Sequence, residues 1–342
     1  MIKDMHYLRQ AAVLYGTEVE ELQPITEGFQ NEIYQFSKNS TEWIVRITAG
    51  KHKSEHSIKS ELEYIQFLKR CDISVSEPVP SMKGNLIEEL RCNGESYYCS
   101  VFVKAEGGPI RVQDPAQWNA SLFKNWGELL GRLHQVGKQY EIELTDVQVK
   151  RPRWSEEHPY NHEFFLNLKP GAVKEKYESV VSALHTFPMD ANHFGLIHND
   201  FHQGNIFVKD GTITLFDFDD CSYFWFAYDV AAAFYHAYWQ HTSFNGPDPT
   251  FDQTFLVPFL KGYAKGNILS EELIDQIPFF LKLRELFLYQ LFHKVWNINH
   301  LEDWQAYTIN NLKKNIEANT VYASLDQNRI LQIKKALNVF DK

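Results

Sequence analysis

The stretch 198–220, HNDFHQGNIFVKDGTITLFDFDD, is the most informative part of the chain. Its centre predicts a β-hairpin, because residues 206–208 and 212–216 are apolar or β-branched and a short polar segment separates them. That connection, Lys209-Asp210-Gly211, has three residues and ends in glycine, which takes a positive φ without steric cost. The hairpin brings the polar residues on its two flanks to one end.

Strand pairing would place two oxygen-bearing side chains close together. If Val208 pairs with Thr212, Asn205 lies opposite Leu215, and Asp217 lies two residues further along. Amide and carboxylate oxygens are hard ligands suited to Mg²⁺, which takes few protein groups and completes its shell with phosphates and water. The pattern therefore indicates a magnesium site at this end of the hairpin.

A third such side chain, Asp200, lies five residues before Asn205 and would stand beside that metal. Phosphoryl transfer needs this combination, because a carboxylate orients and deprotonates the attacking hydroxyl while a metal neutralises the phosphate charge. An alternative stays open, since His198, Asp200 and His202 offer three ligands for a transition metal. That alternative leaves Asn205 and Asp217 unexplained.

Two charged residues interrupt apolar patterns in the first part of the chain. Residues 41–48 alternate as a strand, with Arg46 in mid-strand among apolar neighbours. Residues 55–70 have apolar side chains at helical spacing, and Glu61 falls within that stripe. Because burying either charge alone is costly, we predict an Arg46–Glu61 ion pair. Periodicity alone equally allows each side chain to lie at the edge of its face and reach water.

The composition of the segments changes near residue 100. The first hundred residues are strand-rich with one clear helix, and the remainder is dominated by aromatic helical segments such as 277–296. This predicts two unequal lobes, residues 1–103 and 104–342, joined by a short segment near 103–108. The paired glycines of that segment, Gly107 and Gly108, would permit a backbone turn.

A glycine-containing turn, residues 26–31, precedes a strand-like run near the start of the chain. Such a turn can bring backbone amides close to a phosphate, although a single glycine between polar residues more often marks a hairpin corner. The pattern GxxxxGK[ST] is absent from the sequence, which disfavours a P-loop enzyme.

Charge and cysteine content narrow the class of protein. The 342 residues carry a formal net charge of -10, which offers no basic surface for nucleic acid. The four cysteines have neither CxxC spacing nor the density of a disulfide scaffold, so a reducing compartment fits best. No apolar run follows Met1, and no segment is apolar enough to span a bilayer. We expect a cytoplasmic protein with no nucleic-acid or membrane partner; the sequence leaves its oligomeric state open.

Taken in order, these motifs resemble the aminoglycoside phosphotransferase and choline kinase superfamily. The run from His198-x-Asp200 through Asn205 to Asp217-Phe218-Asp219 is similar to the catalytic and metal-binding loops of that family. Residues 127–134, GELLGRLH, resemble the helix before the catalytic loop, and residues 228–231, YDVA, resemble the helix start after it. The likeness covers roughly residues 24–240.

The resemblance implies an α+β, protein-kinase-like bilobal fold with a nucleotide held between the lobes. The smaller N-terminal lobe would be an antiparallel β-sheet with one main helix, and the larger C-terminal lobe would be mostly helical. The implied roles are Asp200 as catalytic base, Asn205 and Asp217 as Mg²⁺ ligands, and Gly28, Asn31, Arg46, Glu61, Val103 and Ala105 at the ATP site. Arg46 stands where many relatives have lysine, and a planar fork contacts phosphates differently from a point charge.

Two other residues are expected to support the catalytic loop. The ring of His198 is expected to hydrogen-bond to a backbone carbonyl within that loop. Asp229 opens the apolar run 230–238 and is interpreted as a helix N-cap, while the resemblance implies that it braces the loop. The two roles are compatible.

The sequence thus predicts an ATP-dependent phosphotransferase that acts on a hydroxyl of a small molecule, such as an aminoglycoside, amino alcohol, homoserine or sugar-like acceptor. One alternative is a protein Ser/Thr kinase of the same superfamily, which would need an open groove in place of a closed pocket. The other is a nucleotide-binding regulator without transfer activity, against which the intact set of Asp200, Asn205 and Asp217 argues.

Overall fold

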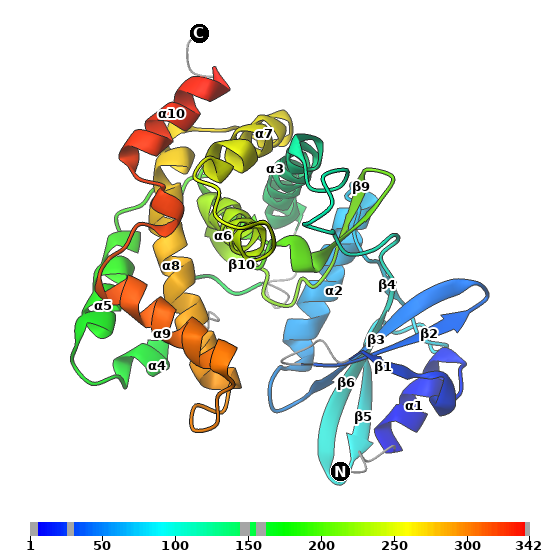
Figure 1. Cartoon of the computed structure of the whole chain (residues 1–342). Coiled ribbons are helices and arrows are strands. Elements are labelled where there is room, and N and C mark those ends of the chain that lie inside the picture. The colour runs from blue at the N-terminus through cyan, green and yellow to red at the C-terminus, as the bar shows by residue number, and fades with distance from the viewer. Residues whose placement is uncertain (1–5, 26–30, 144–150, 155–161, 339–342) are drawn as a thin grey trace.

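A computed structural model describes residues 6–25, 31–143, 151–154 and 162–338, which form two lobes (Figure 1). The smaller lobe consists of α1 (His6–Tyr15), η1 (Val19–Glu21), β1 (Gln23–Ile25), β2 (Glu32–Lys38), β3 (Thr41–Ala49), α2 (Glu55–Arg70), β4 (Pro78–Val79), β5 (Glu88–Cys92) and β6 (Glu95–Val103). The larger lobe begins with α3 (Ala120–Glu143), α4 (His162–Leu166), α5 (Ala172–Leu184), β7 (Phe194–Ile197), η3 (Gln203–Asn205), β8 (Ile206–Lys209), β9 (Thr212–Leu215) and β10 (Ser222–Trp225). It continues with α6 (Phe226–Asn245), α7 (Phe251–Gly266), α8 (Glu271–Val295), α9 (Asp303–Glu317), η4 (Tyr322–Ser324) and α10 (Gln327–Leu337).

The smaller lobe is built on an antiparallel sheet with a helix on each face. Within the described residues, six strands form this sheet in the order β1-β2-β3-β6-β4, and β5 pairs with β6. Side chains of β3 alternate between the faces, as predicted: Val45 and Ile47 share a hydrophobic cluster with α1, whereas Arg46 points to Glu61 of α2. The predicted α+β, kinase-like architecture is confirmed, while the boundary at 103/104 stays a prediction.

Helix α2 spans the residues predicted from its apolar spacing. Ser54 caps its start by accepting a hydrogen bond from the Ser57 N–H at 3.2 Å. The apolar side chains at helical spacing are almost fully buried, which explains why this segment folds as a helix against the sheet and the larger lobe; they are Ile58, Leu62, Ile65 and Leu68.

The segment between the lobes turns at a glycine, as the sequence predicts. Gly107 has φ +86°, and a Cβ there would lie 2.2 Å from the carbonyl oxygen of Val208. Its neighbour Gly108 exchanges two backbone hydrogen bonds with Val208, with N···O distances of 3.3 and 3.0 Å. The interlobe segment is therefore packed directly on the hairpin.

The hairpin β8–β9 is present, but the predicted register is wrong by one residue. Val208 pairs with Ile213 instead of Thr212, and the connection is Asp210-Gly211 instead of three residues. Both connecting residues have positive φ, 49° and 80°, which is the two-residue turn whose twist matches paired strands. Ile206 consequently faces Leu215, and Asn205 comes opposite Phe216, nearer to Asp217 than expected.

Four packed helices, α3, α6, α7 and α8, make up much of the larger lobe. Helix α3 packs on α7, and α6 packs on both α7 and α8 (Figure 1). Strands β7 and β10 form a two-stranded antiparallel sheet in which Ile197 pairs with Ser222. This pairing fixes both ends of the segment that carries the catalytic motifs.

None of the helices among the described residues combines the length and apolarity needed to cross a membrane.

Glycines allow α3 and α7 to approach until their backbones touch. A Cβ at Gly127 would lie 1.9 Å from the carbonyl oxygen of Phe259, and a Cβ at Gly262 would lie 1.9 Å from that of Lys124. Because no side chain fits there, Gly127 and Gly262 are required for this packing, even though glycine weakens a helix.

We therefore expect Gly127→Ala and Gly262→Ala each to lower the free energy of unfolding by about 2 kcal/mol or more, since an added methyl forces two helices apart. Urea denaturation measures this change. Gly108→Ala is the control, because a Cβ at Gly108 meets nothing within 4 Å, and its expected effect is below about 0.5 kcal/mol. Equal small effects in all three variants would contradict the close packing.

Candidate active site

The predicted ion pair between β3 and α2 is confirmed. Arg46 Nη1 and Nη2 each lie 2.8 Å from one carboxylate oxygen of Glu61, in a two-pronged contact. The residues are 5% and 1% exposed, so neither side chain reaches bulk water. The pair fixes α2 against the sheet and holds the guanidinium at the boundary between the lobes.

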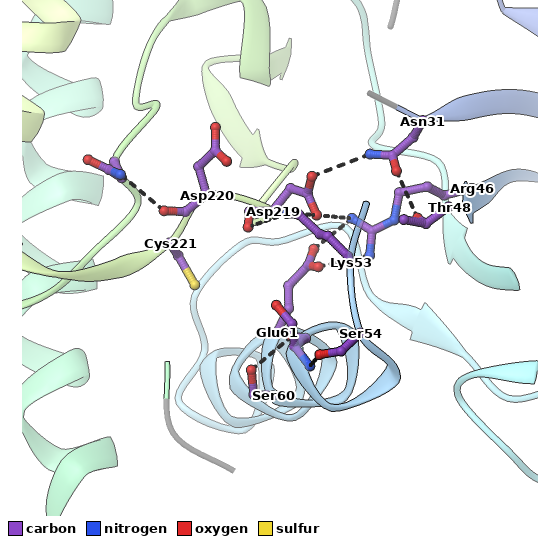
Figure 2. Close-up of polar contacts among 12 residues, drawn as sticks. Asn31, Arg46, Thr48, Lys53, Ser54, Ser60, Glu61, Asp219, Asp220 and Cys221 are labelled. Atoms are coloured by element: carbon purple, nitrogen blue, oxygen red, sulfur yellow. Dashed lines mark hydrogen bonds and ion pairs between the residues drawn. The ribbon is translucent and has the colours of Figure 1, made fainter. Parts of the chain in front are cut away.

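Asp219 connects the two lobes. Its carboxylate lies 2.6 Å from Lys53 Nζ and 3.6 Å from Arg46 Nη1, and it accepts a longer hydrogen bond of 3.4 Å from Asn31 Nδ2 (Figure 2). Asn31 is itself held by Thr48, whose hydroxyl donates to the amide oxygen at 2.7 Å. Lys53 belongs to no motif recognised in the sequence, so its contact with Asp219 was not predicted.

Asp229 braces the catalytic loop from inside the protein. Its carboxylate accepts hydrogen bonds from the backbone N–H groups of His198 and Asn199, both at 2.8 Å, and contacts His134 Nε2 at 3.2 Å. The bracing role is thus confirmed. The N-cap interpretation is wrong, because α6 begins earlier and its N-cap is Trp225. The earlier start is explained by the pairing of β10 with β7, which leads directly into the helix.

His198 is a structural residue, as predicted. Its Nε2 lies 3.1 Å from the carbonyl oxygen of Phe216, and its Nδ1 accepts the backbone N–H of Asp200 at 3.3 Å. Both ring nitrogens are therefore engaged by backbone groups. Burial lowers the pKa of His198, which keeps the ring neutral and suited to this arrangement.

Three side chains donate to the carboxylate of Asp200. Oδ1 lies 2.5 Å from Arg284 Nη2. Oδ2 lies 3.2 Å from His202 Nε2 and 3.0 Å from Asn205 Nδ2. Burial alone would raise the pKa of Asp200, but the donors His202 and Arg284 outweigh it and hold that pKa well below its usual range.

The histidine-rich metal site left open by the sequence is not supported. His198 takes no part in the metal-like cluster found among the described residues, which consists of Asp200, His202 and His236. Arg284 already donates to Asp200 and lies 2.8 Å from His236 Nε2. A guanidinium at two of the three ligand atoms repels a second cation.

Asn205 and Asp217 lie at the same end of the hairpin, and their chemistry suits a divalent cation. Asn205 donates its amide N–H to the Asp200 carbonyl at 2.9 Å, so the amide nitrogen faces the loop and the amide oxygen faces away. Asp217 follows Phe216, whose N–H donates to the Asn205 carbonyl at 3.0 Å. These two side-chain oxygens fit the preference of Mg²⁺ for hard ligands.

Negative charge is concentrated at this end of the hairpin. The Asp217 side chain is exposed to solvent at its tip, and desolvation by the neighbouring groups together with the Asp219 carboxylate raises the pKa of Asp217 to about 7. Desolvation also raises the pKa of Asp220 to about 6. In contrast, Lys53 and Arg46 overcome burial and lower the pKa of Asp219 to about 2. A cation here would relieve the repulsion.

The remaining residues predicted for the nucleotide site lie on the interlobe segment or outside the described residues. Val103 donates its N–H to the Glu77 carbonyl at 2.8 Å and accepts from the Ser76 hydroxyl at 2.5 Å. Ala105 is buried beside it, at 8% exposure. Gly28 falls in the segment 26–30, which lies outside the described residues.

The family follows from comparison with known proteins. Residues 21–268 match the family model described as phosphotransferase enzyme family, which is well over half of the chain. The chain belongs to the phosphotransferase enzyme family. The predicted superfamily is confirmed, as is the prediction of a phosphotransferase enzyme that acts on an alcohol group.

The relatives described next align with this chain over nearly their whole length. An amicoumacin kinase of Bacillus subtilis (strain 168) is 29% identical over 320 residues, covering 93% of this chain and 94% of the relative. The solved structure of amicoumacin kinase hAmiN in complex with AMP-PNP, Ca²⁺ and Ami superposes with a TM-score of 0.86 at 29% identity, covering 96% and 97% of the two chains. A microcompartment-associated aminopropanol kinase has the same fold, with a TM-score of 0.70 at 19% identity, covering 94% of this chain and 100% of that one.

Removing one residue of the buried Arg46–Glu61 ion pair is expected to destabilise this protein strongly. Glu61→Ala leaves the Arg46 guanidinium buried without its carboxylate, which should lower the free energy of unfolding by about 3 kcal/mol, measured by denaturant titration. Glu63→Ala is the matched control on the same helix, because Glu63 pairs with Lys59 at 3.8 Å on the surface. Its expected effect is below about 0.5 kcal/mol, and a comparable loss in both variants would contradict the role of burial.

Proposed function

We propose that this enzyme transfers the γ-phosphate of ATP to a hydroxyl of a small molecule, with Mg²⁺ as the metal. The observation that carries the proposal is the convergence of Asp200, Asn205 and Asp217 at one end of the β8–β9 hairpin. The buried Arg46–Glu61 pair faces the same region from the other lobe, through Asp219. A metal-bound triphosphate between these groups would lie beside the metal ligands, the catalytic carboxylate and the cation that phosphoryl transfer uses.

In the proposed reaction, Asp200 accepts a hydrogen bond from the acceptor hydroxyl and orients its oxygen toward the γ-phosphorus. A bond forms between that oxygen and phosphorus, the bond from phosphorus to the β,γ-bridging oxygen breaks, and ADP leaves. The hydroxyl proton passes to Asp200 and then to water. Because the pKa of Asp200 is low, its main contribution is orientation of the hydroxyl, and proton transfer comes late.

Asn205 and Asp217 would hold the metal ion, through an amide oxygen and a carboxylate. When bound, Mg²⁺ supplies positive charge that neutralises the phosphate oxygens. Arg46 would contact the phosphates, with Asn31 nearby; Gly28, outside the described residues, stays a prediction for the same site. Glu61 would hold Arg46 in place, and the adenine would lie against the segment from Val103 to Ala105.

Amicoumacin is the first acceptor to test, because an amicoumacin kinase is similar to this chain over 93% of its length. The net charge of -10 also suits a cationic or neutral acceptor better than an anionic one. Room for a small molecule exists in the larger lobe, in a cavity of about 260 Å³ between α6, α8 and α9. One wall of that cavity is Trp239, whose ring lies 6.1 Å from that of His236 in the Asp200 cluster.

Two substitutions should separate the roles of the carboxylates. Asp200→Asn is expected to lower kcat by about 10²–10⁴-fold with little change in nucleotide affinity, because it removes the group that orients the hydroxyl. Asp217→Ala should instead weaken binding of Mg·ATP, because it removes a metal ligand. Steady-state kinetics with amicoumacin and calorimetry with Mg·AMP-PNP give the two quantities. Equal loss of nucleotide binding in both variants would overturn this assignment.

If amicoumacin is not phosphorylated, the same assay extends to kanamycin, choline, ethanolamine and homoserine. ATP consumption with none of them, by protein that binds Mg·ATP, would contradict the proposed transfer activity and favour a nucleotide-binding regulator.

Metal binding should depend on pH through Asp217. Its pKa is raised to about 7, so its contribution to stability in the metal-free protein falls as pH rises from about 4, its value in an unfolded chain, to about 7. Mg²⁺ competes with the proton and should raise Tm more at pH 8 than at pH 6, as measured by differential scanning fluorimetry. An equal Mg²⁺ effect at both pH values, or an undiminished effect in Asp217→Asn, would contradict the metal site.

A further inference from the structure

Arg284 is a buried cation that no motif of the sequence marks. It lies in the middle of α8, is 2% exposed, and donates from Nη2 to Asp200 Oδ1 at 2.5 Å. The side chain of Asp200 is 27% exposed, so part of it is open to solvent. A guanidinium has no acceptor atoms and stays charged, which makes this a permanent contact.

The other donors of Arg284 determine the state of His236. Nε and Nη2 lie 3.2 and 2.8 Å from His236 Nε2, and Nη1 lies 3.2 Å from the hydroxyl of Tyr228. Because the guanidinium can only donate, His236 Nε2 must accept, so this imidazole is neutral. Burial, with the neighbouring His202 and the charge of Arg284, holds the pKa of His236 well below its usual range, in agreement with that state.

The ring of His202 closes the circle around Asp200. Its Nδ1 accepts the backbone N–H of Gly204 at 3.0 Å, so Nε2 carries the proton and donates to Asp200 Oδ2 at 3.2 Å. The rings of His202 and His236 stack with their centroids 4.4 Å apart and planes 24° apart. Each side chain of the circle Asp200, Arg284, His236 and His202 therefore limits the movement of the next.

This circle determines which part of the carboxylate remains available. Oδ2 accepts two donors, His202 and Asn205, whereas Oδ1 accepts Arg284. Rotation of the carboxylate would break all of these contacts together. A carboxylate oxygen has two lone pairs, so Oδ1 can accept one further hydrogen bond in the carboxylate plane.

We propose that Arg284 is a positioning residue for the transfer reaction: it fixes the carboxylate plane of Asp200 so that Oδ1 receives the acceptor hydroxyl. The inference rests on the proposed function and adds to it a residue from α8, a helix whose sequence suggests only core. In this proposal Arg284 acts through Asp200.

A double-mutant cycle tests this. With Mg·ATP and amicoumacin, or whichever compound of the panel above the wild type phosphorylates, Arg284→Met should lower kcat by about 10²-fold in the wild-type background. In the Asp200→Asn background it should lower kcat by less than about threefold, because its target is already lost. KM for ATP should change by less than about threefold. Arg284→Lys keeps the charge without the fork and should lose an intermediate factor.

Arg329→Met is the matched control, because Arg329 also forms an arginine–aspartate pair, with Asp252 between α10 and α7, away from the catalytic loop. Its effect on kcat should be the same factor in both backgrounds. An equal factor for Arg284→Met in both backgrounds would overturn the proposal, since a residue that only supports the packing of α8 acts independently of Asp200.

A crystal structure of Arg284→Met supplies a readout that needs no acceptor. The proposal expects the Asp200 carboxylate to rotate away from His202 or Asn205; an unchanged carboxylate plane overturns it, whatever the activity. If Arg284→Met does not fold, the structure of Arg284→Lys decides by the same criterion. If the wild type transfers no phosphate, only the proposed function is contradicted. The positioning role of Arg284 is still tested, because the crystal structure measures the orientation of Asp200 without any acceptor.

Discussion

The carboxylate of Asp229 is the constraint on which the candidate active site depends. It is fully buried, and it accepts the backbone N–H groups of His198 and Asn199 just before Asp200. The loop at Asn199 has φ +70°, a conformation that an unbraced chain rarely keeps. His134 of α3 contacts both Asp229 and Tyr263 of α7. The glycine-mediated packing of α3 on α7 is therefore linked to the catalytic loop through the side chains of His134 and Asp229.

Charge complementarity joins the two lobes at the same place. The smaller lobe contributes cations, of which Arg46 is held by Glu61 and Lys53 by Asp219. The larger lobe contributes the carboxylates at the end of the hairpin, where desolvation and the acidic neighbours of Asp217 raise its pKa. At the interface between the lobes, cations thus compensate the charge of Asp219, whereas the charge of Asp217 is not compensated. This charge pattern suits a metal-bound triphosphate between the lobes.

Local patterns predicted the site well where a short segment determines it, and poorly where distant segments meet. The apolar spacing of α2 gave both its bounds and the buried partner of Arg46, because a charge in an apolar stripe needs an opposite charge. The predicted register of the β8–β9 hairpin was wrong by one residue, because Asp-Gly and Lys-Asp-Gly are both plausible connections between two strands. Arg284 was missed because it lies 84 residues beyond Asp200 on a helix that looks like core. Its only signal was an arginine in a largely apolar helix.

The central claim is that Asp200, Asn205 and Asp217 surround one metal-bound nucleotide. A crystal structure of the protein with Mg·AMP-PNP tests it most directly. The account predicts Mg²⁺ ligated by the amide oxygen of Asn205 and a carboxylate oxygen of Asp217, with the γ-phosphate facing Asp200. A nucleotide bound elsewhere, or a metal ion that contacts neither Asn205 nor Asp217, would contradict it.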